Sequence, residues 1–254
     1  GCGRNTILTT TTADLDIITA TGAADSEKVG ILIADLCIDG TAGGSTVSLA
    51  INFTYVDYSK VRDIWVLNCT TWGGVGLITC DFNKIIGNTF KNSGETFYIE
   101  TSCFNIIADN SISGGDYEGI FLTELSNSNT ISDNICQGNS SHGIYLAGSN
   151  SNTISGNICQ GNGNYGIYVS AGNNVVSGNI CQRNNDHGIF VSGNNNIVSD
   201  NVCQWNGDHG IYVSGDNNVV SGNNCQGNSQ AADNTYDNIG ISSHPLDYVT
   251  SNEV

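Results

Sequence analysis

The chain has 254 residues, with 24 acidic and 7 basic side chains and a formal net charge of −17 at pH 7. This charge disfavours nucleic acid and anionic lipid as partners, and no run of 18 apolar residues predicts a membrane span. Glycine, asparagine, serine and threonine are abundant, proline occurs once and methionine is absent, which favours short strands and turns over helices.

The beginning of the chain reads as the interior of a repeated fold. Residues 1–8 (GCGRNTIL) lack an initiator methionine and look like the middle of a strand and a turn. We expect that residue 1 is not the native start and that an N-terminal cap is missing, because an uncovered end exposes a row of strand edges. Residues 29–43 alternate between apolar and polar side chains and end in a turn, which predicts an early coil.

Charged side chains without regular spacing follow between about residues 40 and 125, and function is expected there because irregular loops commonly carry it. One group comprises Asp57, Lys60, Arg62, Asp63, Trp65, Trp72, Asp81 and Lys84, and a second, acidic group comprises Glu95, Glu100, Asp116, Glu118 and Glu124. Carboxylate oxygens are the ligands that Ca²⁺ prefers. Candidate calcium ligands are therefore Glu95, Glu100, Asp116 and Glu118, and no other metal or cofactor is expected. Ordinary charged surface is the alternative for both groups.

Five near-copies of one phrase fill the chain from residue 132 to residue 230. They read SDNICQGNSSHGIYLAGS, SGNICQGNGNYGIYVSAG, SGNICQRNNDHGIFVSG, SDNVCQWNGDHGIYVSG and SGNNCQGNSQ, and their cysteines are 23, 22, 22 and 22 residues apart. Such a period indicates stacked units that bury one continuous core. A unit of this size has room for three short strands joined by turns. The sequence therefore predicts an all-β, single-domain, right-handed parallel β-helix of roughly ten coils.

Stacked copies predict ladders of equivalent side chains about 4.8 Å apart. The core ladders are Ile144, Ile167, Ile189 and Ile211, and Leu146, Val169, Val191 and Val213; a ladder of mutually bonded amides is Asn134, Asn157, Asn179, Asn201 and Asn223. Cys136, Cys159, Cys181, Cys203 and Cys225 are expected to be buried, reduced thiols, because in-register Cβ atoms lie beyond the usual disulfide range. Cys2, Cys37, Cys69, Cys80 and Cys103 share no register, and a disulfide among them is left open.

The outward side chain of each Gly-Ile-Tyr-Val strand is aromatic. The strip comprises Phe121, Tyr145, Tyr168, Phe190 and Tyr212, and Tyr98 extends it. Exposed aromatic patches tend to mark contact surfaces, and aromatic faces suit the C–H faces of sugar rings. These residues are candidate glycan-binding groups. The alternatives are cross-strand stabilisation of the sheet and coverage by a loop or a second chain.

A polar pair precedes each Gly-Ile of the repeat, and in two neighbouring copies the pair is Asp-His. Adjacent coils place Asp186, His187, Asp208 and His209 close together. Glycosidic hydrolysis needs paired carboxylates, and histidine can relay protons, so these four are the catalytic candidates. Solvated turn residues are the alternative reading. A lyase is disfavoured because Arg183 is the only basic residue past Lys91.

Residues 229–254 break the period and contain Pro245. We expect a cap or exit segment there and a β-helix over residues 1–228, since terminal units must shield the open edge.

The repeat NxISGNxxxxNxxxGIYVSGxxN resembles those of NosD-like, pectin-lyase-like parallel β-helix proteins. The resemblance implies the fold and leaves the activity open, because one scaffold carries many functions. The first functional hypothesis is an extracellular, cell-surface or virion-associated β-helix that binds glycans or acts as a scaffold without catalysis. A polysaccharide hydrolase or lyase, and a rod that trimerises or stacks end to end, are the alternatives.

Overall fold

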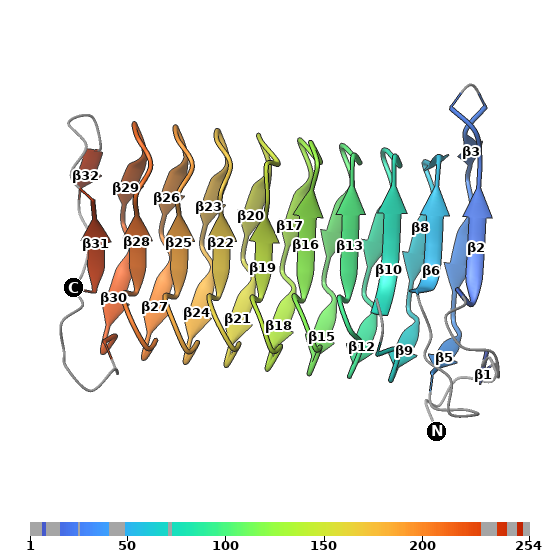
Figure 1. Ribbon diagram of the computed structural model, residues 1–254, viewed down its shortest axis with the longest axis horizontal. Coiled ribbons are helices and arrows are strands. Elements are labelled where there is room, and N and C mark those ends of the chain that lie inside the picture. Colours follow the sequence, from blue (N-terminus) through green and yellow to red (C-terminus); the bar gives the residue numbers. More distant parts are fainter. Residues whose placement is uncertain are drawn as a thin grey trace.

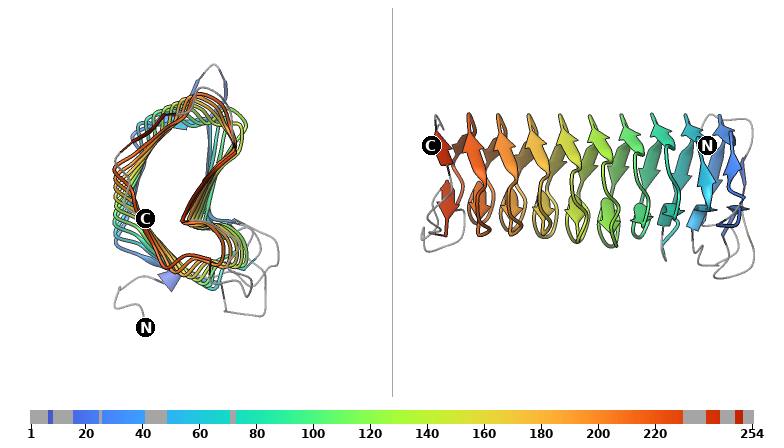
Figure 2. Two further views of the ribbon diagram at one scale, coloured as in Figure 1. Left: turned by 90° about the vertical axis from the view of Figure 1, so that its left-hand side faces the viewer. Right: turned by 90° about the horizontal axis from the view of Figure 1, so that it is seen from above.

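A computed structural model describes residues 7–8, 16–24, 26–40, 49–70, 73–229, 238–242 and 248–250. The described chain winds into an elongated solenoid in which three parallel sheets run along the axis (Figure 1). Viewed along that axis, the coils superimpose on one another (Figure 2). Each sheet contains ten strands among the described residues. The predicted parallel β-helix is therefore confirmed.

The chain passes from the first sheet to the second and then to the third in each coil. The first sheet contains β2 (Ile18–Thr21), β6 (Leu49–Thr54), β10 (Gly73–Ile78), β13 (Phe97–Glu100), β16 (Ile120–Thr123), β19 (Ile144–Leu146), β22 (Ile167–Val169), β25 (Ile189–Val191), β28 (Ile211–Val213) and β31 (Ile239–Ile241).

The second sheet contains β4 (Leu32–Ala34), β8 (Lys60–Arg62), β11 (Lys84–Ile86), β14 (Ile106–Ala108), β17 (Thr130–Ser132), β20 (Thr153–Ser155), β23 (Val175–Ser177), β26 (Ile197–Ser199), β29 (Val219–Ser221) and β32 (Tyr248–Thr250). The third contains β1 (Ile7–Leu8), β5 (Cys37–Asp39), β9 (Trp65–Leu67), β12 (Thr89–Lys91), β15 (Ser111–Ser113), β18 (Ile135–Gln137), β21 (Ile158–Gln160), β24 (Ile180–Gln182), β27 (Val202–Gln204) and β30 (Asn224–Gln226). A short pair, β3 (Lys28–Val29) with β7 (Val56–Asp57), lies beside them.

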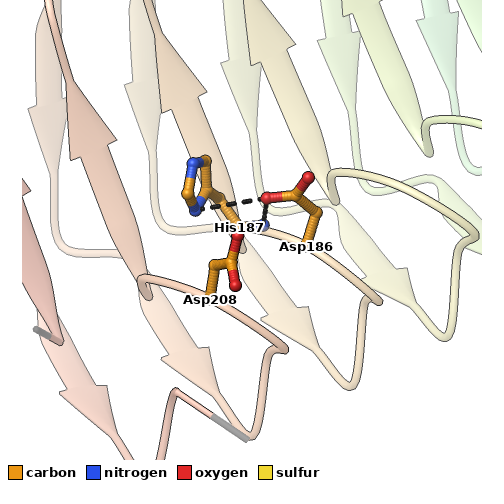
Figure 3. Close-up of side chains that lie close together, drawn as sticks. All are labelled: Asp186, His187 and Asp208. Atoms are coloured by element: carbon orange, nitrogen blue, oxygen red, sulfur yellow. Dashed lines mark hydrogen bonds and ion pairs between the residues drawn. The ribbon is translucent and has the colours of Figure 1, made fainter. Parts of the chain in front are cut away.

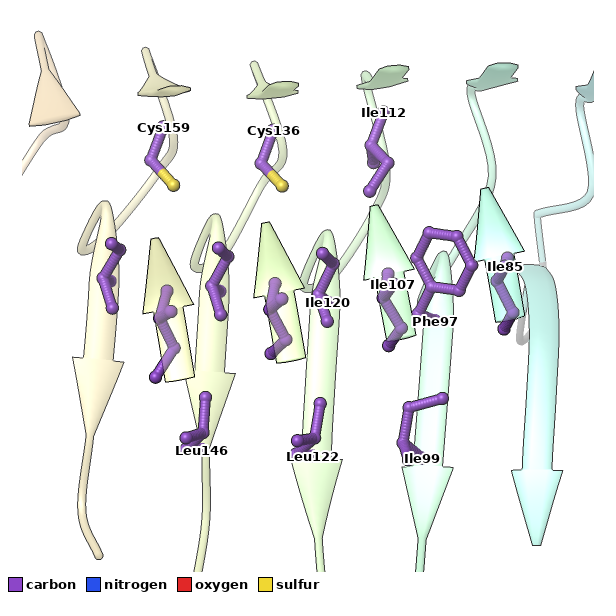
Figure 4. Close-up of a cluster of buried hydrophobic side chains, with 14 of the residues drawn as sticks. Ile85, Phe97, Ile99, Ile107, Ile112, Ile120, Leu122, Cys136, Leu146 and Cys159 are labelled. Carbon is purple, nitrogen blue, oxygen red and sulfur yellow. The ribbon is translucent and has the colours of Figure 1, made fainter. Parts of the chain in front are cut away.

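Successive side chains of each three-residue strand point alternately into and out of the solenoid, so every strand contributes to one narrow core. In the first sheet, Ile144 pairs with Ile167 and Leu146 with Val169, and all four are fully buried. Figure 4 shows these ladders beside buried isoleucines of the second sheet and cysteines of the third. The predicted core ladders are confirmed.

The cysteine ladder packs as small apolar side chains. Cys136, Cys159, Cys181, Cys203 and Cys225 pair in register on the third sheet and are free, fully buried thiols. Among the remaining cysteines, Cys69, Cys80 and Cys103 are free, whereas Cys37 is disulfide-bonded. Cys2 lies outside the described residues.

Asparagine ladders line all three corners of the solenoid, whereas the sequence predicted only one. The predicted ladder joins the second sheet to the third, and it includes Asn88 and Asn110 as well as Asn134 to Asn223. The corner from the first sheet to the second carries Asn83, Asn105, Asn129, Asn152, Asn174, Asn196 and Asn218; the corner from the third to the first carries Asn139, Asn162, Asn184, Asn206 and Asn228.

The end of the chain adds two strands to the solenoid. β31 pairs with β28 and β32 pairs with β29, both in parallel. The expected boundary at residues 228 and 229 stays a prediction, and residues 230–237, 243–247 and 251–254 lie outside the described part, as do residues 1–6 of the expected truncated start. Among the described residues, no helix is long and apolar enough to cross a membrane.

Candidate functional site

The aromatic strip predicted on the first sheet is present, and its rings stack on one another. Tyr145 and Tyr168 pair in register with ring centroids 4.7 Å apart, and Tyr168 and Phe190 follow at 4.9 Å, each pair inclined by only 4°. Phe121 and Tyr212 continue the strip at its two ends. Each inner ring therefore covers the faces of its neighbours. Sugar rings would meet mainly ring edges and hydroxyl groups, whereas the sequence suggested open faces.

A second column of rings runs beside the strip, and the sequence did not predict it. It contains His142, Tyr165, His187 and His209, each at the residue before a glycine of the repeat. The centroids of His142 and Tyr165 are 4.9 Å apart, and those of Tyr165 and His187 are 5.3 Å apart. Burial lowers the pKa of His142, and burial with the neighbouring His209 lowers the pKa of His187 to about 4. The 22-residue step of the polar pairs was the available signal.

The structure brings three of the four catalytic candidates together (Figure 3). Ligand atoms of Asp186, His187 and Asp208 all lie within 4.8 Å of one another. Asp186 Oδ1 accepts a hydrogen bond from the backbone N–H of His187 at 2.9 Å and lies 3.4 Å from His187 Nδ1. The fourth candidate, His209, stacks its ring on Tyr212, and its backbone N–H donates to His187 Nδ1 at 3.2 Å.

The geometry of this cluster bears on both cation binding and hydrolysis. Burial and a hydrogen bond to Asp186 raise the pKa of Asp208, so the two carboxyl groups share one polar contact. Glycosidases hold their carboxyl groups roughly 5–9.5 Å apart, with the scissile bond between them. The nearest carboxylate oxygens of Asp186 and Asp208 lie within 4.8 Å of each other, close to the short end of that range. Two carboxylates and a neutral imidazole are a donor set that divalent cations accept.

The acidic group of the first sheet divides into two separate pairs. Glu95 interacts with Glu118, whose Oε1 also accepts a hydrogen bond from Ser141 Oγ at 2.7 Å. Glu100 Oε2 accepts a hydrogen bond from Tyr98 Oη at 2.9 Å. Asp116 takes part in neither pair. The four candidate calcium ligands therefore do not converge on one point, and calcium binding by them stays a prediction.

Glu95 supplies a pH-dependent term to stability. Burial, and secondarily the Glu118 carboxylate, raise the pKa of Glu95 from 4.5 to about 7. The folded state holds this proton more tightly than the unfolded state, so stability declines as pH rises from about 4.5 through 7. Glu95→Gln is expected to raise the thermal midpoint at pH 8 and to leave it nearly unchanged at pH 4. Thermal unfolding against pH checks this, with the exposed Asp109→Asn as control; an equal effect of Glu95→Gln at both pH values would contradict it.

A shallow trough of ≈ 400 Å³ lies where β19, β22 and β25 end, at the corner between the first and second sheets. Its lining consists of glycine, alanine, serine and asparagine, including Asn150, Ser170, Ser192, Asn194 and Asn195, and contains no ionisable side chain. The aromatic strip borders it, because Ser192 Oγ donates a hydrogen bond of 3.4 Å to Tyr168 Oη. The sequence did not predict the trough.

Two asparagines of the trough offer hydrogen-bond donors. Asn150 Oδ1 accepts from the backbone N–H of Gly172 at 2.9 Å, and Asn194 Oδ1 accepts from the backbone N–H of Asp216 at 2.7 Å. These bonds fix the two amides in place. Within the described part of the chain, neither amide nitrogen has a hydrogen-bond partner, so both remain available to a ligand.

Comparison with known proteins bears on the fold. Residues 49–201 match the family model for the right-handed β-helix region. The chain belongs to this family. Its resemblance to pectin-lyase-like parallel β-helices is thereby confirmed, and none of the curated proteins shows significant sequence similarity to it.

Solved structures of this β-helix class share the architecture at low sequence identity. A periplasmic alginate epimerase is 16% identical, with a TM-score of 0.71 over 98% of this chain and 78% of that one. The A-module of a mannuronan C-5 epimerase from Azotobacter vinelandii is 15% identical, with a TM-score of 0.72 over 97% and 76%. The Dettilon tailspike protein is 16% identical, with a TM-score of 0.52 over 93% and 60%. Likeness at this level shows the fold alone.

Proposed function

We propose that this β-helix protein binds an uncharged glycan in the trough and does not catalyse a reaction on it. The observation that carries the proposal is the lining of the trough, which offers hydroxyl and amide groups and no charge. Sugar hydroxyl groups are matched by such donors and acceptors, and a few polar groups placed in a concave site fix a ligand's orientation. The edge of the aromatic strip, at Tyr168, adds a phenol hydroxyl and apolar C–H surface.

Electrostatics favours a neutral glycan over a polyuronate. The similar structures include enzymes named for alginate and mannuronan, but this chain has a net charge of −17. A polyanionic chain approaching it meets long-range repulsion. The setting we propose is extracellular or virion-associated, in keeping with the periplasmic and tailspike proteins of the same fold.

Two variants at matched glycines test the trough. Gly148 lines it and Gly138 does not, both have a φ near +65°, and a Cβ at either would meet nothing within 4 Å. Gly148→Gln places a side chain at the lining of the trough and is expected to weaken binding about tenfold or more, which is about 1.4 kcal/mol. Gly138→Gln carries the same backbone strain and is expected to bind within about twofold of wild type.

The measurement is binding to an array of neutral oligosaccharides followed by calorimetry on the strongest binder. Equal affinities for the two glutamine variants would place the binding site elsewhere. Binding of acidic glycans alone would contradict the neutral ligand class.

The Asp186 cluster favours one second candidate, a polysaccharide-modifying enzyme. It would release reducing ends or convert sugars in a manner that Asp186→Asn abolishes. Product formation that survives both Asp186→Asn and Asp208→Asn would show that this cluster is not the catalytic site. Trimerisation or end-to-end stacking stays a prediction, which light scattering would settle.

A further inference from the structure

One column of residues at the corner between the first and second sheets has left-handed backbone in each coil from Gly30 to Asn217. A hydrogen bond links each member's N–H to the carbonyl just before the next member, one coil along. The column comprises Gly30, Tyr58, Phe82, Phe104, Ser128, Ser151, Asn173, Asn195 and Asn217, and their φ angles lie between 50° and 71°. Glycine and asparagine tolerate this conformation, whereas bulky side chains rarely adopt it.

Three neighbouring members of this column are aromatic and exposed. Tyr58, Phe82 and Phe104, named here the aromatic ridge, are 62%, 41% and 52% exposed. Their rings stack with centroids 4.9 and 5.1 Å apart and are inclined by 4° and 7°, so they present mainly their edges, as the strip does, but they are more exposed than the half-buried rings of the strip. Each therefore combines a strained backbone with an unburied apolar ring, where the other coils place glycine, serine or asparagine. A strained backbone and an exposed aromatic ring both cost stability, and residues that combine such costs without being buried often serve a function.

Among the described residues, small side chains border the two ends of the aromatic ridge. Beyond Tyr58 the next column member is Gly30, where an added Cβ would meet nothing within 4 Å, and beyond Phe104 the next is the small Ser128. Asp57 and Asp81 precede two of the rings, while Lys60 pairs with Lys84 on the neighbouring strands. Asp57 also interacts with the Glu27 carboxylate, so acidic and basic groups both lie near the ridge and no excess of positive charge favours a polyanion or an anionic membrane.

The aromatic ridge continues the trough along the same corner. Asn195 is a member of the left-handed column and also lines the trough. Only the coil of Ser128 separates Phe104 from the trough residues Gly148 and Asn150, a distance of about 10 Å at one strand spacing per coil. Rings that recur at each coil suit a ligand that itself repeats, which a glycan chain does.

We propose that Tyr58, Phe82 and Phe104 form a second subsite of the glycan-binding surface, where a neutral chain that leaves the trough packs its C–H groups against the exposed edges of the three rings. This inference rests on the proposed function of the trough. Short chains would occupy the trough alone. Long chains would also contact the ridge and therefore bind more tightly. The ligand class is an uncharged polysaccharide of repeating pyranose units.

The test compares disaccharides with chains of about eight units in the cellulose-, mannan- and chitin-derived series. The ridge variant Tyr58→Asn/Phe82→Asn/Phe104→Asn installs the residue that other coils use at this position. It is expected to bind disaccharides like wild type and to lose a tenfold or larger advantage for long chains. Because asparagine tolerates the left-handed conformation, its thermal midpoint is expected to equal or exceed that of wild type. Trp205→Asn removes an exposed aromatic residue at φ 55° from another corner and is the matched control.

The outcomes distinguish failure of the ridge subsite from failure of the trough. A ridge variant that keeps the long-chain advantage, or that loses thermal stability, overturns the subsite and leaves the trough intact. Loss of disaccharide binding in Gly148→Gln supports the trough whatever the ridge does, and retention overturns the trough. If wild type binds no chain of these series, both proposals fail. Binding to phosphatidylcholine or phosphatidylserine vesicles that only the ridge variant loses would replace the glycan with a membrane surface.

Discussion

Replacing Asn179 by alanine is expected to lower the free energy of unfolding by about 3 kcal/mol or more, since each buried polar group left without a partner costs about 1–3 kcal/mol. Asn179 is fully buried in the ladder between the second and third sheets. Its amide nitrogen donates to Ile154 O at 2.9 Å and to Asn201 Oδ1 at 3.0 Å. Its Oδ1 accepts from both nitrogens of Asn157, at 2.9 and 3.0 Å. Alanine removes these four bonds and a longer one from the same nitrogen to Ser177 O at 3.3 Å, and it leaves buried partners unsatisfied.

Urea-induced unfolding of Asn179→Ala checks this expectation. Asn185→Ala changes the same residue type at an exposed position of the following turn and is expected to shift stability by less than about 0.5 kcal/mol. Similar losses in the two variants would show that the ladder contributes no more than an ordinary surface asparagine.

Replacing Gly166 by alanine is expected to destabilise the fold by about 2–3 kcal/mol, at the upper end of the usual cost of overpacking. Gly166 precedes β22, and a Cβ there would lie 2.6 Å from the backbone oxygen of Gly188 and 2.8 Å from Asn184 Nδ2. Neither atom can withdraw, because one belongs to the next coil's backbone and the other to a buried amide ladder. Equivalent glycines occur at residues 143, 188 and 210.

Thermal and urea unfolding of Gly166→Ala measure this cost. Gly161→Asn is the control in the same coil, because a Cβ there meets nothing within 4 Å and its φ of 63° suits asparagine. A Gly166→Ala variant as stable as Gly161→Asn would mean that adjacent coils separate easily, which contradicts a rigid stack.

The repeated parts of the fold could be predicted because stacking requires the same kind of side chain at equivalent positions of successive coils. Ile167, Cys181 and Asn179 each occupy a position that every coil must fill in the same way, so the 22-residue period reports inward and corner positions directly. The order of three sheets and the buried thiols follow from that period. The sequence does not reveal the two further asparagine ladders, because within a single coil their asparagines look like ordinary turn residues.

The functional surfaces could not be predicted in the same way. The aromatic strip was placed correctly, yet its mutual stacking depends on ring orientation, which spacing does not specify. The trough arises from the shape of successive turns lined by glycine and serine, and small residues give no signal of a cavity. The ridge residues Tyr58, Phe82 and Phe104 lie in the irregular half of the chain. The one signal that aligns them in sequence is that each directly precedes a member of a hydrogen-bonded ladder, namely Ser59, Asn83 and Asn105.

A crystal structure of the protein with the neutral oligosaccharide that binds most tightly would locate the binding site. We expect sugar density in the trough, with hydroxyl groups in hydrogen-bond contact with Asn150, Ser192 or Asn194, and longer chains extending toward Phe104. Density confined to the outer faces beside Asp186 and Asp208, or to any surface away from the corner of the first and second sheets, would contradict this expectation.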